Sequence, residues 1–358
     1  MNRAAQATID TAALRANLGV VRSFAPGSRI MAVIKANAYG HGIVPVARAL
    51  AGADAFAVAR LEEAHAIRQA GLETPIVLLE GIFHTDQMAL AASLRLEIVV
   101  HSPEQLEMLE QFDNAYRFPV WLKIDTGMNR LGFPDTVVDD VARRLSGCDS
   151  VETPIRFMTH LSSAEERFES TTPEQIKRFD SVLAGIDAER SIANSAGVIA
   201  WPGSHADWVR PGLMLYGVSP LRDKTAADLD LKPAMTLTTE LIAIKTVSAG
   251  GRVGYGGRWM ATEETRLGVA AIGYGDGYTR HLGDGTPVMV AGQPAILVGC
   301  ISMDLITIDL GGAPDARVGD EVLLWGEQLP VERLAEAAGT IPYEMLCGVT
   351  QRVAMTVI

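Results

Sequence analysis

The segment VIKANAYGHG, residues 33–42, places a lysine directly after an apolar run that predicts a buried strand. A strand that is buried on both faces rarely carries a lysine, so Lys35 needs a special position. At the carboxyl end of a barrel strand it would project into the mouth of the barrel, where active sites form. A partly desolvated lysine loses its proton more readily and can form a Schiff base with a carbonyl compound. The alternative is a lysine that extends from the strand end into solvent.

Polar residues also follow several later apolar runs. They are Lys123, Asp125 and Arg130 in KIDTGMNRLG at the end of the fifth run, His160 at the end of the sixth, Asn194 and Ser195 at the end of the seventh, and Arg210 at the end of the eighth. Any one of them could be a helix cap or an ion-pair partner. Polar groups at the ends of many strands are what a barrel active site requires, so together they indicate one.

Two further motifs do not carry the chemistry that they suggest. DTG at 125–127 resembles an aspartic-protease loop, but that chemistry needs two carboxylates that share a proton, and no second D-[TS]-G occurs. GYGDGY at 273–278 is rich in glycine, but it breaks the G-x-G-x-x-G spacing and opens no clear helix. Neither motif supports a protease or a dinucleotide site.

The elements that must position these residues alternate along the first two thirds of the chain. Eight short apolar runs predict strands at 30–34, 55–59, 76–79, 97–100, 119–124, 155–159, 191–194 and 207–209. Helical patterns lie between them, for example at 61–70, 103–112 and 173–183. Eight strands that alternate with helices predict a (β/α)8 barrel. A doubly wound open sheet also fits, because periodicity alone does not close a barrel.

The pattern changes after Gly217. Residues 219–233 are polar and predict a linker, and β-rich runs follow at 235–247, 266–274, 287–299 and 305–310, with one helical pattern at 331–339. We therefore expect a barrel over residues 1–225 and a C-terminal β domain over 226–358. The first few residues could pack with the β domain.

Composition narrows the classes of function. The chain has 358 residues, 48% hydrophobic and 21% charged, with a formal net charge of −12. Nucleic acids and anionic membranes are poor partners for such a charge. No apolar run approaches the roughly 20 residues that span a bilayer, and the N-terminal residues do not form a signal-peptide core. The three cysteines are far apart and the seven histidines form no H-x-H or H-E-x-x-H pair, so we expect a cytoplasmic protein with reduced thiols and no metal site.

At these residues the sequence closely resembles the alanine racemases over nearly the whole chain. The matching blocks are VIKANAYGHG (33–42), KIDTGMNRLG (123–132), MTH (158–160), NSA (194–196), RPGLMLYG (210–217), VGYGG (253–257), IGYGDGY (272–278), ISMD (301–304) and IPYE (341–344). The resemblance implies a (β/α)8 barrel with a C-terminal β domain, a homodimer with shared active sites, and pyridoxal phosphate on Lys35. It implies interconversion of L- and D-alanine, either to supply D-alanine for the cell wall or to degrade alanine.

The resemblance also implies a role for each matching residue. Lys35 would be the base on the D-alanine face of the cofactor–substrate Schiff base, and Tyr255 of the partner subunit the base on the L-alanine face. The residues that would hold the phosphate are Tyr39, Ser195, Tyr343 and the backbone amides of Gly212 and Leu213. The other implied contacts are Arg210 at the pyridine nitrogen, His160 and Asn194 in the cofactor network, Arg130 at the phenolic oxygen and the substrate carboxylate, the Met303 amide at that carboxylate, Tyr274 and Arg280 at the entrance, and Lys123 as a carbamylated lysine.

Elementary chemistry supports these roles. Racemisation removes a proton from one face of a planar carbanion and returns one to the other, which suits two opposed bases. An arginine titrates above ~12 and cannot accept the pyridine proton. Arg210 would therefore weaken the cofactor as an electron sink and limit side reactions. A free tyrosine titrates near ~10, so Tyr255 needs nearby positive charge to act as a base at neutral pH.

One position departs from the family pattern. Many members have an arginine where this chain has Cys300, so the electrostatics of the entrance differ. Three alternatives stay open at this stage: a barrel-type pyridoxal-phosphate decarboxylase of diamino acids, an amino-acid racemase of broader specificity, and a non-catalytic pyridoxal-phosphate carrier. The decarboxylases usually have a Gly-Gly-Gly phosphate loop and an acidic pyridine partner, which this barrel segment lacks. The carriers resemble a barrel alone, which the β domain argues against.

Overall fold

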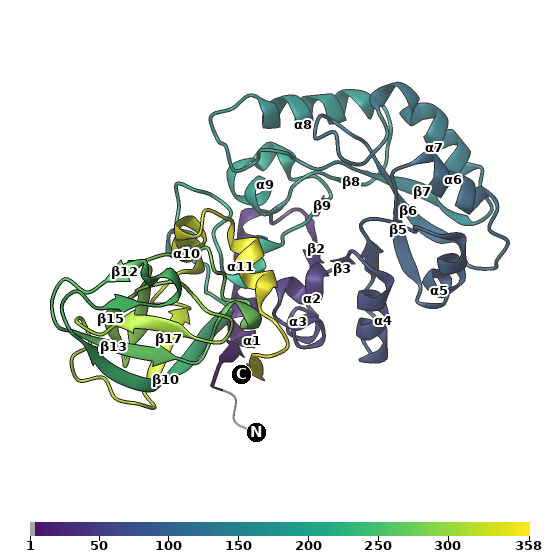
Figure 1. Ribbon diagram of the computed structural model, residues 1–358. Helices are drawn as coiled ribbons and strands as arrows, with labels where there is room; N and C mark the ends of the chain where they lie inside the picture. Colours follow the sequence, from purple (N-terminus) through teal and green to yellow (C-terminus); the bar gives the residue numbers. More distant parts are fainter. Residues whose placement is uncertain (1–3) are drawn as a thin grey trace.

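The computed structural model describes residues 4–358, and its N-terminal half is a closed parallel barrel (Figure 1). The barrel strands are β2 (Arg29–Val33), β3 (Ala55–Val58), β4 (Ile76–Leu78), β5 (Leu96–Val100), β6 (Phe118–Lys123), β7 (Val151–Met158), β8 (Arg190–Ser191) and β9 (Trp208–Val209). The barrel closes where β2 pairs in parallel with β9, with Ile30 opposite Val209. The predicted (β/α)8 barrel is confirmed, and the open doubly wound sheet is wrong.

Helices cover the outside of the barrel. They are α3 (Ile43–Ala49), α4 (Leu61–Gln69), α5 (Met88–Ser93), α6 (Pro103–Glu110), α7 (Val138–Ser146), α8 (Thr171–Val182) and α9 (Ser195–Ala200). The short segment labelled α2 (Lys35–Tyr39) has a left-handed backbone and lies at the mouth of the barrel. Directly after β9 the chain forms a short 3-10 helix at Leu213–Tyr216 in place of an α-helix that covers the barrel. Helix α1 (Thr11–Phe24), which precedes the first barrel strand, packs against α3, α9 and that 3-10 helix and so completes the ring.

The C-terminal part is an antiparallel sheet that lies beside the barrel (Figure 1). Its strands are β10 (Met235–Val247), β13 (Thr265–Ala270), β14 (Pro287–Val290), β15 (Gln293–Leu297), β16 (Ile306–Asp309) and β17 (Glu321–Trp325). Helices α10 (Val331–Ala337) and α11 (Pro342–Gly348) follow. The two chain ends add β1 (Gln6–Ile9) and β18 (Ala354–Val357) to the sheet, where β1 pairs with both β10 and β18.

Two segments differ in detail from the sequence expectation. The single run at 287–299 is a hairpin, because Ala291 and Gly292 both have positive φ and form the tight turn that antiparallel strands favour. The polar segment 219–233 buries Leu221, Leu229 and Leu231, so it packs against the core. In the described part of the chain, no helix is long and apolar enough to cross a membrane.

Candidate active site

The predicted polar residues converge on one cavity at the mouth of the barrel. Lys35 follows β2, Lys123 ends β6, His160 follows β7 and Arg210 follows β9, so each enters the cavity from the carboxyl end of a strand. The cavity has a volume of ≈ 450 Å³, and its lining is Val33, Lys35, Ala36, Tyr39, Leu79, Glu80, Lys123, Arg130, Leu131, Met158, Thr159, His160, Asn194, Ser195, Arg210, Gly212, Leu213, Tyr343 and Cys347.

The lining separates the predicted site residues into two groups. Lys123 and every residue that the sequence assigned to cofactor binding lie in it. Tyr255, Tyr274, Arg280 and Met303 lie outside it, in the C-terminal domain. A single chain therefore brings the barrel groups together but leaves the second proposed base, the entrance residues and the proposed carboxylate amide elsewhere.

The sequence interpretation missed three polar members of the cavity, Glu80, Thr159 and Cys347. Glu80 directly follows the apolar run at 76–79, so the strand-end rule that identified Lys35 could also have found it. Its carboxylate forms a salt bridge of 3.0 Å with Arg60. Cys347 is one helical turn after Tyr343 on α11, and no local signal marks it because a distant helix brings it to the barrel.

The cavity is strongly cationic. Within residues 4–358, Lys35, Lys123, Arg130 and Arg210 form no salt bridge, although Asp125 lies near enough to Lys123 to favour its charge. Burial, followed by the charges of Arg210, Arg130 and Lys35, lowers the pKa of Lys123 to about 8. Such a set of unpaired cations favours an anionic ligand.

Arg210 is a buried residue of the cavity lining that several hydrogen bonds hold in place. Its guanidinium donates to Ser191 Oγ at 2.6 Å, to Ile192 O at 3.2 Å and to Thr159 O. It also lies 3.5 Å from His160 Nδ1. Burial and the neighbouring charge of Arg210 hold the pKa of His160 well below its ordinary value, so the imidazole is neutral and Nδ1 can accept from Arg210. Burial lowers the pKa of Arg210 to about 10, so it remains a cation at neutral pH.

One wall of the cavity is a cradle for an anion. Ser195 Oγ accepts from the Gly212 amide at 2.8 Å and from the Met214 amide at 3.4 Å, which leaves its own proton free to donate into the cavity. A Cβ atom on Gly212 would lie 2.5 Å from the Tyr39 hydroxyl oxygen, so only glycine lets the backbone approach this closely.

Tyrosine hydroxyls complete this cradle. Burial raises the pKa of Tyr39 far above its ordinary value and raises that of Tyr343 to about 12, so both keep their protons and can donate to an anion. Together with Ser195 and the cations they fit the phosphate of pyridoxal phosphate, and Lys35 supplies an amine for its aldehyde. The donor set thus fits the cofactor that the resemblance implied.

The backbone that joins Lys35 to Tyr39 is left-handed. Ala36, Asn37, Ala38 and Tyr39 have φ of 53°, 53°, 55° and 51°. This conformation costs an L-residue about 1–2 kcal/mol, and residues other than glycine seldom adopt it in succession. The turn presents Lys35 and Tyr39 to the same cavity, so the surrounding structure must hold it in place.

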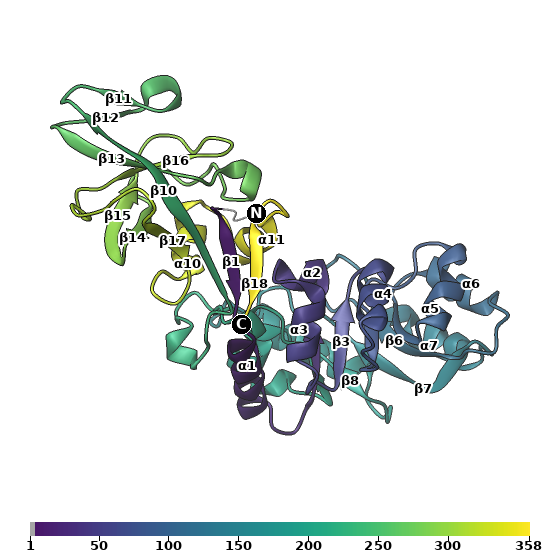
Figure 2. The same cartoon turned by 90° about the horizontal axis from the view of Figure 1, so that it is seen from below.

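Tyr255 lies at the tip of a projecting hairpin, which we call the arm (residues 252–260). The arm consists of β11 (Arg252–Val253), a 3-10 turn (Tyr255–Gly257) and β12 (Trp259–Met260). Gly254 and Gly256 flank Tyr255 with φ of 70° and 72°, which suits glycine, and the Tyr255 side chain is 69% exposed. In both views the arm lies on the side of the molecule away from the barrel helices α5 and α6 (Figure 2).

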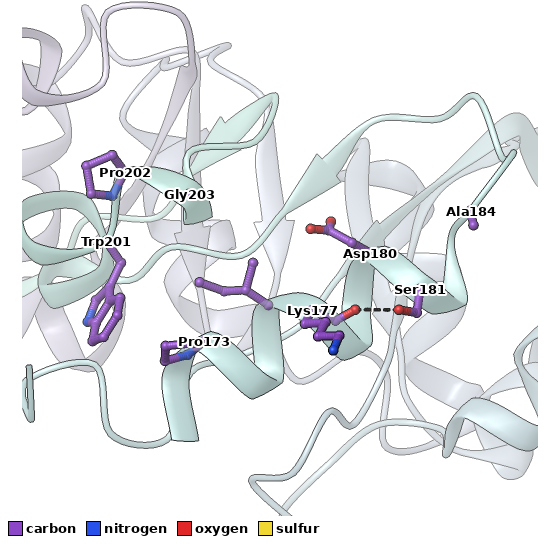
Figure 3. Close-up of a pocket in the computed structure, with 9 residues that line it drawn as sticks. Pro173, Lys177, Asp180, Ser181, Ala184, Trp201, Pro202 and Gly203 are labelled. Carbon is purple, nitrogen blue, oxygen red and sulfur yellow. Dashed lines mark hydrogen bonds between the residues drawn. The ribbon is translucent and has the colours of Figure 1, made fainter. Parts of the chain in front are cut away.

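A second hollow lies on the outer wall of the barrel, between α8 and the segment 201–203 (Figure 3). It is lined largely by apolar groups around Trp201, with Lys177 and Asp180 as its charged members. The Ser181 hydroxyl donates to the Lys177 carbonyl at 2.8 Å. It shares no lining residue with the cavity at the barrel mouth and gathers no comparable set of cations and donors.

Comparisons with known proteins give one consistent family. Residues 9–220 match the model of the alanine racemase N-terminal domain and residues 234–357 that of the alanine racemase C-terminal domain. The chain is 53% identical to the alanine racemase of Aeromonas hydrophila over 353 residues, which cover 99% of each chain. It is 54% identical to that of Nitrosococcus oceani over 351 residues, which cover 98% of each.

Solved structures show the same similarity. The biosynthetic alanine racemase of Pseudomonas aeruginosa superimposes with a TM-score of 0.97 at 44% identity, over 100% of both chains. The alanine racemase of Bartonella henselae, solved with covalently bound pyridoxal phosphate, superimposes with a TM-score of 0.91 at 31% identity, also over 100% of both chains.

Proposed function

Since the chain belongs to the alanine racemase family and is a pyridoxal-phosphate-dependent enzyme that interconverts L- and D-alanine, we propose that Lys35 and Tyr255 are its two acid/base groups. One observation carries the proposal for the site. Lys35 lies in a cationic cavity with phosphate donors, while Tyr255 is exposed on an arm outside that cavity.

The barrel residues hold the cofactor in this proposal. Tyr39, Ser195, Tyr343 and the amides of Gly212 and Leu213 bind its phosphate. In the structure the Gly212 amide donates to Ser195 Oγ, so it would have to exchange this partner for the phosphate. Arg210 would donate to the pyridine nitrogen, Arg130 would bind the phenolic oxygen, and His160 and Asn194 would complete the surroundings. When bound, the cofactor supplies the electron sink that makes the α-proton of alanine acidic.

The two bases then act from opposite sides of the substrate. Lys35 Nζ takes or returns the proton on the D-alanine face, and Tyr255 Oη does so on the L-alanine face. The cluster of Lys35, Arg130 and Arg210 supplies positive charge that stabilises a tyrosinate brought into the cavity. Arg130 and the Met303 amide hold the substrate carboxylate between the two bases.

Tyr255 reaches the cavity from a second copy of the chain in this proposal. Because the Tyr255 side chain is exposed and lies outside its own cavity, a homodimer in which each arm enters the partner's barrel mouth would complete both sites. Tyr274, Arg280 and Met303 would arrive with the same domain and line the entrance. Backbone hydrogen bonds hold the segments of Tyr274 and Met303 side by side. The Gly275 amide donates to Met303 O at 2.9 Å, and the Tyr274 amide donates to Ser302 O at 3.1 Å.

We place the domain boundary between residues 225 and 226, with β1 grouped with the C-terminal sheet because it pairs with β10 and β18. We also propose that the enzyme works in the cytoplasm. The three cysteines, Cys148, Cys300 and Cys347, are all free thiols, which suits a reducing compartment.

Reductive trapping tests the assignment of Lys35. Borohydride reduction of the holoenzyme, followed by peptide mapping, should place the pyridoxyl group on Lys35, because its amine is the one that follows β2 beside Tyr39. The Lys35→Ala variant should take no such label and should not racemise alanine in either direction. A pyridoxyl group on Lys123, the other lysine of the cavity, would contradict the assignment.

The rate of racemisation of each amino acid in a panel, measured with the purified enzyme, separates an alanine-specific racemase from one of broader specificity.

We further propose that Lys123 carries a carbamate. Only a neutral amine reacts with carbon dioxide, and the pKa of about 8 leaves part of Lys123 neutral near pH 7.5. The neutral amine takes up carbon dioxide and releases a proton, so the side chain becomes an anion that the nearby guanidinium groups of Arg130 and Arg210 can stabilise.

The carbamylated fraction should depend on pH with a definite sign. Because the folded pKa is lowered, the reactive amine is scarce well below pH 8 and becomes abundant as pH rises through 8. In bicarbonate labelled with carbon-13, a carbamate resonance should therefore grow between pH 6.5 and 8.5 and be absent from Lys123→Ala. Lys177→Ala, which removes an exposed lysine, should keep the signal. A resonance that survives in Lys123→Ala would place the carbamate elsewhere.

A further inference from the structure

The left-handed turn at Ala36–Tyr39 needs an external support, and His41 directly follows it. Four successive residues with positive φ are strained, and the run continues through Gly40 at 81°. The turn separates the amine of Lys35 from the hydroxyl of Tyr39. A change in its backbone would therefore displace the two groups relative to each other.

His41 contacts this turn through its backbone carbonyls. The His41 side chain is fully buried, and Nδ1 lies 3.1 Å from Ala38 O and 2.9 Å from Tyr39 O. Since both partners are acceptors, Nδ1 carries the proton and donates to both. The two carbonyls belong to residues whose φ values are 55° and 51°, so the imidazole binds the strained part of the chain.

The imidazole ring of His41 also connects the turn to the barrel strand β2 through Tyr216. His41 packs on Tyr216 with ring centroids 4.6 Å apart, and Tyr216 stacks on Tyr39 at 4.7 Å. The Tyr216 hydroxyl donates to Val33 O at 3.0 Å, on the strand that precedes Lys35. His41 thus supports Tyr39 in two ways. Its Nδ1 binds the Tyr39 carbonyl, and its ring packs on Tyr216, which stacks on the Tyr39 ring.

The charge state of His41 matches this role. Burial lowers the pKa of His41 to about 4, so the ring is neutral at physiological pH. Among the described residues Nε2 has no hydrogen-bond partner. A protonated ring would leave a buried N–H group without an acceptor, which would disfavour the folded turn.

We propose that His41 is a positioning residue that holds the left-handed turn, and with it Lys35 and Tyr39, in the geometry that binds pyridoxal phosphate. This inference rests on the proposed function in one respect, that Tyr39 binds the cofactor phosphate. His41 does not line the cavity, so it acts on the cofactor only through the turn.

Two substitutions separate the hydrogen bonds from the ring. His41→Phe keeps an aromatic ring against Tyr216 and removes the donor, whereas His41→Asn keeps a donor near Nδ1 and removes the ring. Equilibrium dialysis of each full-length variant against pyridoxal phosphate measures affinity without relying on activity. We expect about tenfold weaker binding in His41→Phe, the scale of losing one or two neutral hydrogen bonds, and about wild-type binding in His41→Asn.

Hydrogen exchange supplies a second readout. The amides of residues 36–42 should exchange faster in His41→Phe than in the wild type and should be protected again in His41→Asn. His205→Phe is the matched control, because His205 Nε2 also binds a carbonyl, Val198 O at 2.7 Å, but lies outside the cavity. It should leave both the affinity and the exchange of 36–42 unchanged.

The outcomes distinguish this inference from the proposed function. Tyr39→Phe should weaken cofactor binding if Tyr39 holds the phosphate, and unchanged binding there would refute that assignment. Weak binding in Tyr39→Phe with wild-type binding and exchange in His41→Phe would overturn the role of His41 alone. Equal losses in His41→Asn and His41→Phe would show that a donor near the position of Nδ1 does not support the turn, and would overturn the role given to the hydrogen bonds. If His41→Phe fails to fold, wild-type affinity in His41→Asn supports the proposal and a loss there overturns it.

Discussion

Mixing the Lys35→Ala and Tyr255→Phe variants should restore about a quarter of the wild-type racemase sites. Each variant alone should lose activity by roughly 10²–10⁴-fold or more, the usual contribution of one general acid or base. Random re-association in equal amounts makes about half of the dimers mixed. Each mixed dimer has one site with both bases and one site with neither.

The expectation follows from where the two residues lie. Lys35 is in the barrel mouth, and Tyr255 is exposed on the arm and lines no part of that cavity in its own chain. If each arm enters the partner's barrel, an intact arm from Lys35→Ala meets an intact barrel from Tyr255→Phe. The activity of the re-associated mixture, measured against differently tagged subunits that report the mixed fraction, gives the restored share.

Two barrel variants provide the control. A mixture of Lys35→Ala with Arg210→Glu should gain nothing, because every site then contains one damaged barrel. If tagged subunits exchange fully and the Lys35→Ala and Tyr255→Phe mixture still stays inactive, Tyr255 acts within its own chain and the shared-site proposal is wrong.

Arg210→Glu should slow racemisation by about 100-fold or more and raise the share of transamination. The scale is that of losing a preorganised charge from a catalytic site. In the proposed site Arg210 faces the pyridine nitrogen and cannot accept its proton, whereas a carboxylate there would keep the nitrogen protonated. A protonated cofactor is a stronger electron sink, so a new absorption band at long wavelength should appear with alanine.

The substitution also removes the anchors of Arg210, so the fold needs its own control. Arg210 donates to Ser191 Oγ and to the carbonyls of Thr159 and Ile192, which a carboxylate would repel. Arg210→Lys loses much of this geometry but keeps a cation, and it should racemise slowly without the new band. An Arg210→Glu enzyme that folds, binds the cofactor and keeps the wild-type spectrum and product ratio would show that the electronic argument is wrong.

Much of the candidate site was predictable because its residues follow strands. Lys35, Lys123, His160 and Arg210 come directly after apolar runs, and parallel strands in a barrel bring their carboxyl ends to one mouth. The same rule would have identified Glu80. The family resemblance then added what the local pattern does not contain, namely the cofactor, the reaction and the role that we propose for Tyr255.

Other features depend on contacts between distant segments. Tyr343 and Cys347 enter the cavity on α11, about 300 residues after Lys35, and nothing near them in sequence points to a barrel mouth. The left-handed turn is of the same kind, since alanine and asparagine have no strong local preference for four successive positive φ values.

The sequence by itself determined which side chains can do the chemistry, the alternation of strands and helices in the barrel, and the family to which the chain belongs. These properties are local or recur along the chain, so hydrophobic period and motif spacing record them. Only the tertiary structure decided that β2 pairs with β9 to close the barrel, that β1 joins the C-terminal sheet, and that Lys35 and Tyr255 lie apart within one chain. Such pairings are selected by the free energy of burying whole surfaces against each other, which no short segment encodes alone.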